Sequence, residues 1–463
     1  MDILLTHGYF LYEDPHELKV MKPYPPLGIL YNSAYLKREG YSVGVFDTTF
    51  SSMAEFEAHL ERERPPIVGL YTNLMTKFNV LKMIAACRRA GASVILGGPE
   101  PANYAQEYLD RGVDVIVVGE GEATLAELLP RLAKDGPGRL DGIPGIAYRR
   151  DDGSIVRAAT RPYIADLDSL PDPDREAIAV DRYVETWRAH HGMGSVSLIC
   201  ARGCPYHCEW CSHAVYGHTH RRRSPGRVAD EVEFLQARYK PDQLWYADDV
   251  FTIKHSWFFE YAAELERRGI RIPFECISRA DRLTEEVIDR LAALGCYRLW
   301  IGSESGSQTV LDAMRREVKV EAVRAMTHAL KRRGIQTGMF IMLGYEGEEL
   351  ADLEATVDHL KQSAPDVFLT TVAYPIKGTA YYQKVEDRVL ARAGWDQRSD
   401  RQLSVRGRHS MRFYSFATRW MVNSVALHRD RSNGASVART AKAAINVALG
   451  RVGMALTAKE REA

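Results

Sequence analysis

Hydrophobic residues in the first part of the chain form five short, β-rich runs separated by amphipathic stretches. The runs are residues 2–7, 42–47, 67–72, 93–98 and 114–119. Each run is apolar on both faces, as parallel strands are when helices cover both sides of a sheet. The intervening stretches, such as 29–40 and 79–91, have helical spacing, and the second of them ends in a glycine. This alternation predicts a doubly wound, Rossmann-like α/β domain over residues 1–135.

Ligands of doubly wound sheets bind beyond the carboxyl ends of the strands. In this domain the predicted strand ends carry small or polar residues, and glycine there lets a broad ligand approach the backbone closely. We therefore expect a ligand site formed by Thr6, His7, Thr72, Asn73, Gly97, Gly98, Gly119 and Glu120.

Residues 136–195 have a different character. They begin with a loop rich in glycine and proline, "KDGPGRLDGIPG", and continue into "GIAYRRDDGSIVRA", two β-rich runs around a turn. An acidic segment containing prolines, "DLDSLPDPDRE", follows. The pattern predicts a linker that contains a small hairpin.

From residue 196 the alternation of strand and helix resumes. Six β-rich runs, at 196–200, 243–248, 273–278, 298–303, 338–344 and 367–375, are separated by helical patterns at 226–239, 255–268, 284–295, 319–333 and 350–362. Consecutive βα units predict a parallel sheet that curls into a partial (β/α)6 barrel over residues 196–385. Catalytic residues of such barrels lie at the carboxyl ends of the strands.

Residues 386–463 are basic and helix-prone, and we expect a helical C-terminal region there. Its last stretch, "ASVARTAKAAINVALGRVGMALTAKEREA", has the pattern of an amphipathic helix with a basic face. Of the two interpretations, we favour a packed or frayed terminal helix over a weak contact with a membrane surface.

The composition is typical of a soluble globular protein, with 46% hydrophobic and 26% charged residues. Lysine plus arginine equals aspartate plus glutamate at 61 each, so net charge does not indicate a nucleic-acid partner. No apolar run reaches the roughly 18 residues of a membrane span, and the first residues lack the signal-peptide pattern. We expect a cytoplasmic protein without stable membrane insertion. The sequence does not define its oligomeric state.

Three of the seven cysteines stand together in "RGCPYHCEWC", directly after the first strand of the second domain. A structural zinc site needs four ligands, and a disulfide would leave one cysteine over. A [4Fe–4S] cluster held by only three thiolates keeps one iron open for a further ligand. We therefore favour a cluster bound by Cys204, Cys208 and Cys211. The other four cysteines are expected to be small buried residues: Cys87, Cys200, Cys276 and Cys296.

The cysteine spacing, with Trp210 before the last cysteine, resembles the signature of the radical S-adenosylmethionine (SAM) superfamily. The resemblance continues along residues 196–385 through "WYADDVFT", "ISRADRL", "IGSESGSQTVLDAM", "GMFIMLGYEGE" and "YPIKGTAYY". It implies that the three cysteines are catalytic. It also implies that SAM contacts Tyr206, Trp210, Asp248, Asp249, Arg279, Glu304, Ser305 and Gly344.

In this resemblance the acidic pair accepts hydrogen bonds from the methionyl amine, and Arg279 pairs with the carboxylate. Each residue also has a purely structural alternative. Asp248 and Asp249 suit a helix N-cap or a turn, Arg279 a surface ion pair, and Glu304 a hydrogen bond within the barrel.

A doubly wound domain before such a barrel resembles the cobalamin (B12)-binding class of this superfamily. "PPLGILYNSAYLKREGYSVGVFD", "VILGGPEPANYAQEYL" and "DVIVVGEGEATLAELL" carry the likeness, which implies that the eight strand-end residues contact cobalamin. One departure is "DPHELK", where Lys19 stands in place of the glycine of Asp-x-His-x-x-Gly. We therefore favour cobalamin with no protein base below it over ligation by His16 or His7. A domain that no longer binds cobalamin is the alternative.

The cysteines are followed by "HAVYGHTHRRRSP". Its three consecutive arginines suit either an anionic group of a ligand or ion pairs with the acidic segment at 166–176. The residues favour neither interpretation over the other.

The resemblance implies an enzyme that cleaves SAM to a 5′-deoxyadenosyl radical, with an electron donor such as flavodoxin or ferredoxin. We expect methylation of an unactivated carbon, or of phosphorus, in a small-molecule substrate whose identity the sequence does not give. One alternative is a radical cyclase or oxidase like those that form tetrapyrrole rings. The other is a non-catalytic iron–sulfur carrier or sensor.

Overall fold

The computed structural model describes residues 1–432 and 434–463, and the chain divides into two compact units. The first unit comprises residues 1–205, 212–245 and 393–399, and the second comprises 206–211, 246–392 and 400–463. The chain therefore passes between the units several times, and the cysteine segment is itself divided, because Cys204 belongs to the first unit and Cys208 and Cys211 to the second.

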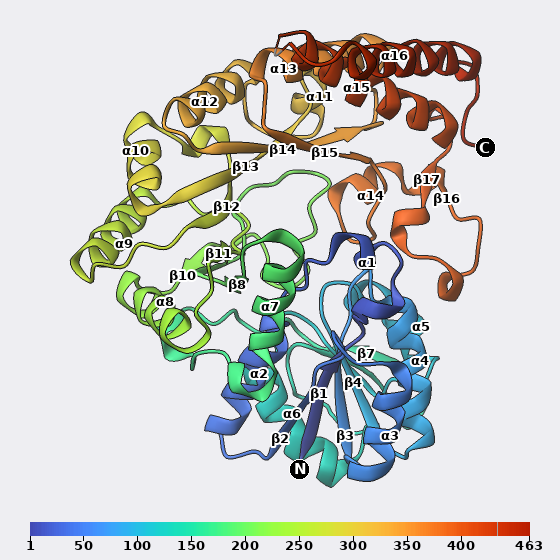
Figure 1. Ribbon diagram of the computed structural model, residues 1–463. Coiled ribbons are helices and arrows are strands. Elements are labelled where there is room, and N and C mark those ends of the chain that lie inside the picture. The colour runs from blue at the N-terminus through green and yellow to red at the C-terminus, as the bar shows by residue number, and fades with distance from the viewer. Residues whose placement is uncertain (433) are drawn as a thin grey trace. The chain divides into compact units, whose positions relative to one another are not determined.

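The first unit contains a seven-stranded sheet in the order β2-β1-β3-β4-β5-β6-β7 (Figure 1). Its strands are β1 Ile3–His7, β2 Val43–Phe46, β3 Ile67–Tyr71, β4 Ser93–Gly97, β5 Val115–Val117, β6 Ile146–Arg149 and β7 Ile155–Arg157. The first five are parallel, which confirms the predicted doubly wound fold. The hairpin predicted inside a linker is β6 and β7, which extends this sheet through antiparallel pairing.

Side chains that alternate along the strands form a hydrophobic core on each face of this sheet. Leu4 and Val68 pack toward α3 (Met53–Glu63), α4 (Lys77–Arg89) and α5 (Ala105–Leu109). Ile3 and Leu5 pack toward α2 (Leu27–Arg38) and α6 (Glu122–Asp135). Because both faces are covered, the strands need apolar residues at every position, which explains the continuous apolar runs.

The first unit also includes helices α1 (Glu17–Val20), α7 (Val180–His191) and α8 (Pro225–Tyr239) and a short antiparallel ribbon. The ribbon pairs β9 (Ala201–Arg202) with β10 (Arg221–Arg222). Helix α7 lies within the segment expected to be a linker. The segment 393–399 also belongs here, because the Trp395 ring packs edge-on against Tyr108, with centroids 4.6 Å apart, and the Lys77 ammonium lies 3.9 Å from the Trp395 ring.

The second sheet has six strands in the order β15-β14-β13-β12-β11-β8, as predicted. They are β8 Ser195–Leu198, β11 Gln243–Tyr246, β12 Phe274–Ser278, β13 Cys296–Glu304, β14 Gln336–Leu343 and β15 Val367–Val372. Their helices are α9 His255–Arg267, α10 Glu285–Leu294, α12 Val320–Arg332 and α13 Leu350–Ser363. A short helix, α11 Gln308–Ala313, was not predicted.

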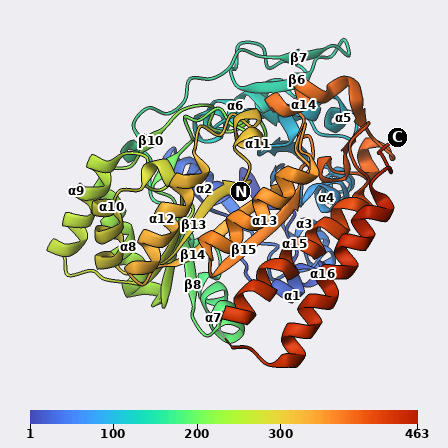
Figure 2. The same cartoon turned by 90° about the horizontal axis from the view of Figure 1, so that it is seen from above.

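After β15 comes α14 (Ala380–Val385), and the C-terminal region contains α15 (Met411–Ser432) and α16 (Val437–Thr457). It is not entirely helical, because β16 (Val389–Leu390) pairs with β17 (Ser404–Val405). Helices α15 and α16 lie side by side (Figure 2). Within residues 1–432 and 434–463, no helix combines the length and apolar character that crossing a membrane requires.

Candidate functional site

The cysteine segment leaves the first unit through a tight glycine turn. Gly203 follows β9 with a φ of +85°, and a side chain there would overlap the carbonyl of Thr219. Only glycine meets both demands without strain. The glycine that precedes the first cysteine is therefore required by the backbone.

Cys208 is buried beside two guanidinium groups. Its sulfur lies 3.8 Å from Nη1 of Arg279 and 3.9 Å from Nη1 of Arg316. A hydrogen bond from Cys211 and the charges of Arg316 and Arg279 lower the pKa of the Cys208 thiol to about 6. The thiolate is the form that ligates iron, so these surroundings fit an iron–sulfur cluster.

The structure brings Cys208 and Cys211 together, whereas Cys204 belongs to the other unit. In the described part of the chain, no three Cys, His, Asp or Glu side chains stand together as a metal-ligand set. A cluster held by all three cysteines therefore remains a prediction from their spacing.

The two arginines are fixed by further contacts. Arg279 follows β12, stacks on the Tyr206 ring at 3.6 Å and donates to Asp281 Oδ1 at 2.8 Å. It also donates to the carbonyl of Arg316 at 2.9 Å. These contacts position Arg279 beside the sulfur, and its predicted pairing with the SAM carboxylate remains a prediction.

Arg316 was not predicted from the sequence. Its side chain donates to the carbonyl of Gly302 at 2.8 Å, and Gly302 leaves room because a Cβ there would lie 2.6 Å from Nη2. The neighbouring residues Arg315 and Glu317 have left-handed φ values of 52° and 54°. Such values are uncommon for residues with a side chain. This unusual loop directs Arg316 inward, and no motif in the sequence indicates it.

The residues between the last two cysteines anchor the segment to the second unit. Trp210, whose predicted contact with SAM remains a prediction, packs against a hydrophobic cluster that includes Met342 and Tyr381. Glu209, which was not predicted, accepts hydrogen bonds from the Tyr345 hydroxyl at 2.7 Å and from Lys384 at 3.2 Å. These contacts hold the backbone on either side of Cys208 and Cys211.

The predicted SAM-contacting residues Asp248, Asp249, Glu304, Ser305 and Gly344 lie at or directly after the carboxyl ends of β11, β13 and β14. Burial raises the pKa of Glu304 to about 7, and Glu304 has a φ of +62°. The backbone itself requires glycine at position 344, because its φ is +74° and a Cβ there would lie 2.7 Å from the Tyr414 ring. The placement suits the predicted roles, which remain predictions.

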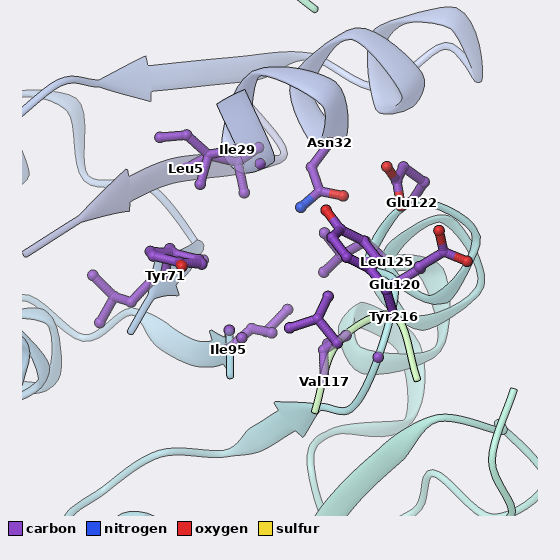
Figure 3. A pocket seen from close by; sticks show the side chains of 18 of the residues that line it. Leu5, Ile29, Asn32, Tyr71, Ile95, Val117, Glu120, Glu122, Leu125 and Tyr216 are labelled. Atoms are coloured by element: carbon purple, nitrogen blue, oxygen red, sulfur yellow. The ribbon is translucent and has the colours of Figure 1, made fainter. Parts of the chain in front are cut away.

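An apolar slot opens on one face of the first sheet, between its strands and helices α2 and α6 (Figure 3). It contains about 690 Å³ of space, part of it continuous with solvent. Its walls include Leu5, Ile95, Val117 and the predicted residues Gly97, Gly98, Gly119 and Glu120. Tyr216, which follows the cysteines in sequence, forms another wall that the sequence did not indicate.

The slot has the features of a ligand site. A Cβ on Gly97 would meet no atom within 4 Å, so the space above this glycine is open. Asn32 projects from α2 into the slot, and its buried Oδ1 accepts no hydrogen bond from the described residues (Figure 3). An unsatisfied buried oxygen is costly, so a ligand that donates a hydrogen bond is favoured there. Cobalamin, which has a flat ring system bearing amide groups, fits this slot.

The other residues predicted to bind cobalamin lie outside the slot. His7 and Asn73 line a second, more polar pocket of about 1210 Å³ at the ends of β1 and β3, and Tyr71 lines both pockets. Thr6 donates to the carbonyl of Phe46 at 2.7 Å, which links β1 to β2. The backbone amide of Thr72 donates to the carbonyl of Gly97 at 2.8 Å.

Neither of the two candidate histidines, His7 and His16, is placed to ligate cobalamin. The side chain of His16 is 78% exposed and lines neither pocket, and Asp14 accepts hydrogen bonds from the amides of His16 and Glu17 at the start of α1. The His7 ring is buried, with Nε2 3.0 Å from Asp47 Oδ1 and Nδ1 3.2 Å from the Thr48 hydroxyl. This arrangement agrees with cobalamin that has no protein base.

The arginine run is engaged in ion pairs. Arg221 and Arg202 both contact the Glu120 carboxylate at 2.8 Å, so the predicted ligand residue Glu120 is held in a buried ionic network. Arg223 pairs with Asp172 of the acidic segment at 2.7 Å. Of the two interpretations of this run, the structure supports ion pairing within the protein.

Comparison with known families agrees with both sites. The model "B12 binding domain" matches residues 18–129, and the model "Radical SAM superfamily" matches residues 198–360. The chain therefore belongs to the cobalamin-binding class of the radical SAM superfamily, and it is an enzyme of that class.

The chain is 27% identical to an uncharacterized methyltransferase of Pyrococcus horikoshii over 80% of this chain and 81% of the relative. It is 26% identical to the anaerobic magnesium-protoporphyrin IX monomethyl ester cyclase of Rubrivivax gelatinosus, over 79% of this chain and 67% of that protein. Among solved structures, the radical SAM methyltransferase TsrM of Kitasatospora setae, with cobalamin and a [4Fe–4S] cluster bound, has the same fold. The TM-score is 0.71 at 20% identity, over 85% of this chain and 81% of TsrM.

Proposed function

We propose that this enzyme cleaves SAM reductively and methylates an unactivated carbon, or phosphorus, of a small-molecule substrate. The proposal rests on one observation: the same chain contains two sites that are each suited to a cofactor. One is Cys208 between two guanidinium groups, and the other is the glycine-walled slot. The likeness to an uncharacterized methyltransferase over most of both chains supports methyl transfer as the outcome.

Cys204, Cys208 and Cys211 would hold a [4Fe–4S] cluster, which when bound would supply the electron for reductive cleavage of SAM. Arg279 and Arg316 hold positive charge against the Cys208 sulfur and stabilise its thiolate form. Trp210 and Glu209 fix the segment and keep the sulfur away from bulk water. In this proposal Asp248, Asp249, Glu304 and Ser305 bind the polar parts of SAM from the strand ends.

The slot would hold cobalamin, which when bound would supply the methyl group. Gly97 and Gly119 leave room for a flat ligand at the strand ends, whereas Gly98 is required by the nearby Thr72 carbonyl. Asn32 Oδ1 would accept a hydrogen bond from the ligand. Tyr216 forms a wall of the slot. Because both nitrogens of His7 are engaged and the side chain of His16 is exposed, neither of these two histidines would ligate the corrinoid.

A second candidate function is oxidative ring formation, favoured by the likeness to the magnesium-protoporphyrin cyclase. It uses the same cleavage of SAM but transfers no methyl group. In either case we expect a reduced protein such as flavodoxin or ferredoxin as the electron donor. We also expect the reaction to occur in the cytoplasm, because seven cysteines in a chain of 463 residues do not indicate a disulfide framework.

The test is product analysis under anaerobic conditions. The enzyme is loaded with corrinoid, its cluster is reconstituted, and SAM with a deuterated methyl group is added with dithionite and pooled small-molecule extracts. Methyl transfer is expected to yield 5′-deoxyadenosine, S-adenosylhomocysteine and a product with a deuterated methyl group.

Two results would contradict methyl transfer in different ways. Formation of 5′-deoxyadenosine together with a dehydrogenated or cyclised product, and no S-adenosylhomocysteine, would establish the cyclase alternative. Absence of 5′-deoxyadenosine with a fully loaded cluster would exclude radical cleavage of SAM. The Cys208→Ala variant, which is expected to form no product, is the control for chemical background.

A further inference from the structure

Helix α16 exposes an almost entirely apolar face. Large side chains on it are far more exposed than is usual for their type: Val437 85%, Ile445 60%, Leu449 46%, Val452 56% and Leu456 79%. Ile445, Leu449, Val452 and Leu456 follow one another at intervals of three or four residues, so they lie along one side of the helix. The alanines between them, Ala438, Ala441, Ala448 and Ala455, are exposed as well.

The opposite face of α16 is fully used in packing. Gly450 and Gly453 lie directly against Trp420 and Phe416 of α15, so the two helices approach closely along their length (Figure 2). Met454 and Thr457 are also buried. The helix is therefore folded and held, and its outward apolar face is not a product of fraying. Contiguous apolar surface of this kind marks an interaction site.

Basic residues outnumber acidic ones around this face. Helix α16 contains no acidic residue, and residues 411–457 contain seven lysines and arginines and a single aspartate, Asp430. By contrast, the whole chain has equal numbers of basic and acidic residues. At the 100° per residue of a helix, Lys442 lies along one border of the apolar face and Arg451 beyond the other. Arg451 also pairs with Glu354 at 2.7 Å, and Arg439 pairs with Asp430 at 2.9 Å. All three basic residues are exposed.

We propose that α16 is a membrane-contact helix, which lies in the plane of an anionic membrane surface. Its apolar side chains enter the boundary between headgroups and acyl chains, and Lys442, with the excess of basic residues over 411–457, is attracted to anionic headgroups. The helix lies on the membrane and does not cross it, in keeping with the absence of any spanning helix in the described chain. The cytoplasmic leaflet carries the required negative charge.

Two features favour a membrane over a protein partner. A second copy of this chain would bring together two regions that each carry an excess of basic residues, and like charges repel. In addition, the exposed face consists of valine, isoleucine, leucine and alanine, so it has no polar side chain to fix the orientation of a protein. A lipid surface needs no such directional contacts.

The experiment is vesicle flotation with the full-length holoenzyme. Vesicles of phosphatidylcholine with phosphatidylglycerol are compared with vesicles of phosphatidylcholine alone. We expect the protein to float with the anionic vesicles and to be released by added salt. Replacing Ile445 and Leu449 together by serine is expected to weaken binding at least about tenfold. The Lys442→Gln variant is expected to weaken it about fivefold.

The matched control is Phe234→Ser on α8, which removes an apolar side chain that is 44% exposed elsewhere on the surface. It should not change flotation. All variants should keep their thermal midpoint and their 5′-deoxyadenosine formation, because none touches the cofactor sites. Equal binding to neutral vesicles, or no binding to anionic ones, would overturn the proposal. So would a dimer, seen by sedimentation without vesicles, that the double variant dissociates.

Discussion

Arg279 and Arg316 approach the Cys208 sulfur from two different loops, and each is fixed by hydrogen bonds to a backbone carbonyl or a carboxylate. Their positive charges favour the thiolate before any metal is present. Groups in this position orient a ligand and tune its metal, although they do not bind the metal themselves. Arg316 is therefore a positioning residue for the cluster.

Replacing Arg316 by glutamine is expected to reduce the affinity for the cluster about tenfold or more, because the sulfur loses a charge and a donor. Iron and acid-labile sulfide are measured after anaerobic reconstitution, together with the thermal midpoint. The control is Arg315→Gln, which changes an exposed arginine one residue away. If Arg316→Gln retains full iron content, the side chain only supports the loop.

Gly203→Ala tests the turn before the first cysteine. The new Cβ would overlap the Thr219 carbonyl at a φ of +85°, so we expect a loss of stability of several kcal/mol. Gly142→Ala is the matched control, because Gly142 has a φ of +90° and no atom within 4 Å of the new Cβ. It should cost only about 1 kcal/mol. Equal thermal midpoints for the two variants would show that the close contact is unimportant.

Among single residues, the sequence indicated those whose positions follow a regular spacing along the chain. It did not indicate those that matter only through contacts made in the folded protein. The cysteines and the strand-end residues were predicted because their positions follow from strand periodicity. Arg316, Glu209 and Tyr216 were not, because each acts through a tertiary contact made by a loop. Asn32 is also invisible in the sequence, since only its burial and unsatisfied oxygen distinguish it.

Among the secondary-structure elements, buried polar contacts fix how helices meet strands. His359 of α13 is fully buried, with Nε2 2.9 Å from the hydroxyl of Ser303 on β13 and Nδ1 accepting from Arg324 at 3.2 Å. Burial and the nearby charge of Arg324 lower the pKa of His359 to about 4. The neutral imidazole is therefore part of the folded second unit.

This burial predicts a loss of stability in acid. An unfolded histidine takes up a proton near pH 6.5, but folded His359 does so only near pH 4. The contribution of neutral His359 to the free energy of unfolding is thus complete above pH 6.5. It is lost progressively as the pH falls to about 4, by up to about 3 kcal/mol.

Thermal unfolding at a series of pH values measures the effect. The wild type should lose more stability on acidification than His359→Gln, which cannot take up this proton. Substituting the exposed His190 by glutamine should leave the pH dependence unchanged. Parallel pH profiles for the wild type and His359→Gln would contradict the assignment.

The element pattern itself was largely predictable, and the exceptions have physical reasons. The sequence predicted the β6–β7 hairpin but not its place in the first sheet. β6 pairs with β5, and the sequence pattern does not show that β5 has an unpaired edge to receive it. The ionic network of Arg221 and Arg202 with Glu120 joins residues far apart in sequence. A run of arginines in the sequence does not show which carboxylates their side chains will pair with.

In the whole molecule, the two cofactor-type sites use separate sets of residues. The slot is formed entirely by the first unit, whereas Cys208, Arg279 and Arg316 belong to the second. We therefore expect each cofactor to be lost without the other.

Filling the slot should remove only the corrinoid. Gly97→Leu places a side chain in open space without backbone strain, so the protein should fold, keep its iron and lose the visible absorption of bound corrinoid. Cys208→Ala should do the reverse. Gly226→Leu is the control, because Gly226 also has no atom within 4 Å of an added Cβ but lies on α8. Retention of corrinoid by Gly97→Leu would place the corrinoid elsewhere.

The segment 393–399 gives the first unit a piece of the distant C-terminal region, because Trp395 packs on Tyr108 and beneath the Lys77 ammonium. A gene fragment that stops after the first sheet would therefore encode a domain lacking part of its own core. Recombination between relatives that exchanged only the N-terminal half would separate Lys77 from the native Trp395. The two halves of this gene are thus expected to be inherited together, although the two sites use separate sets of residues.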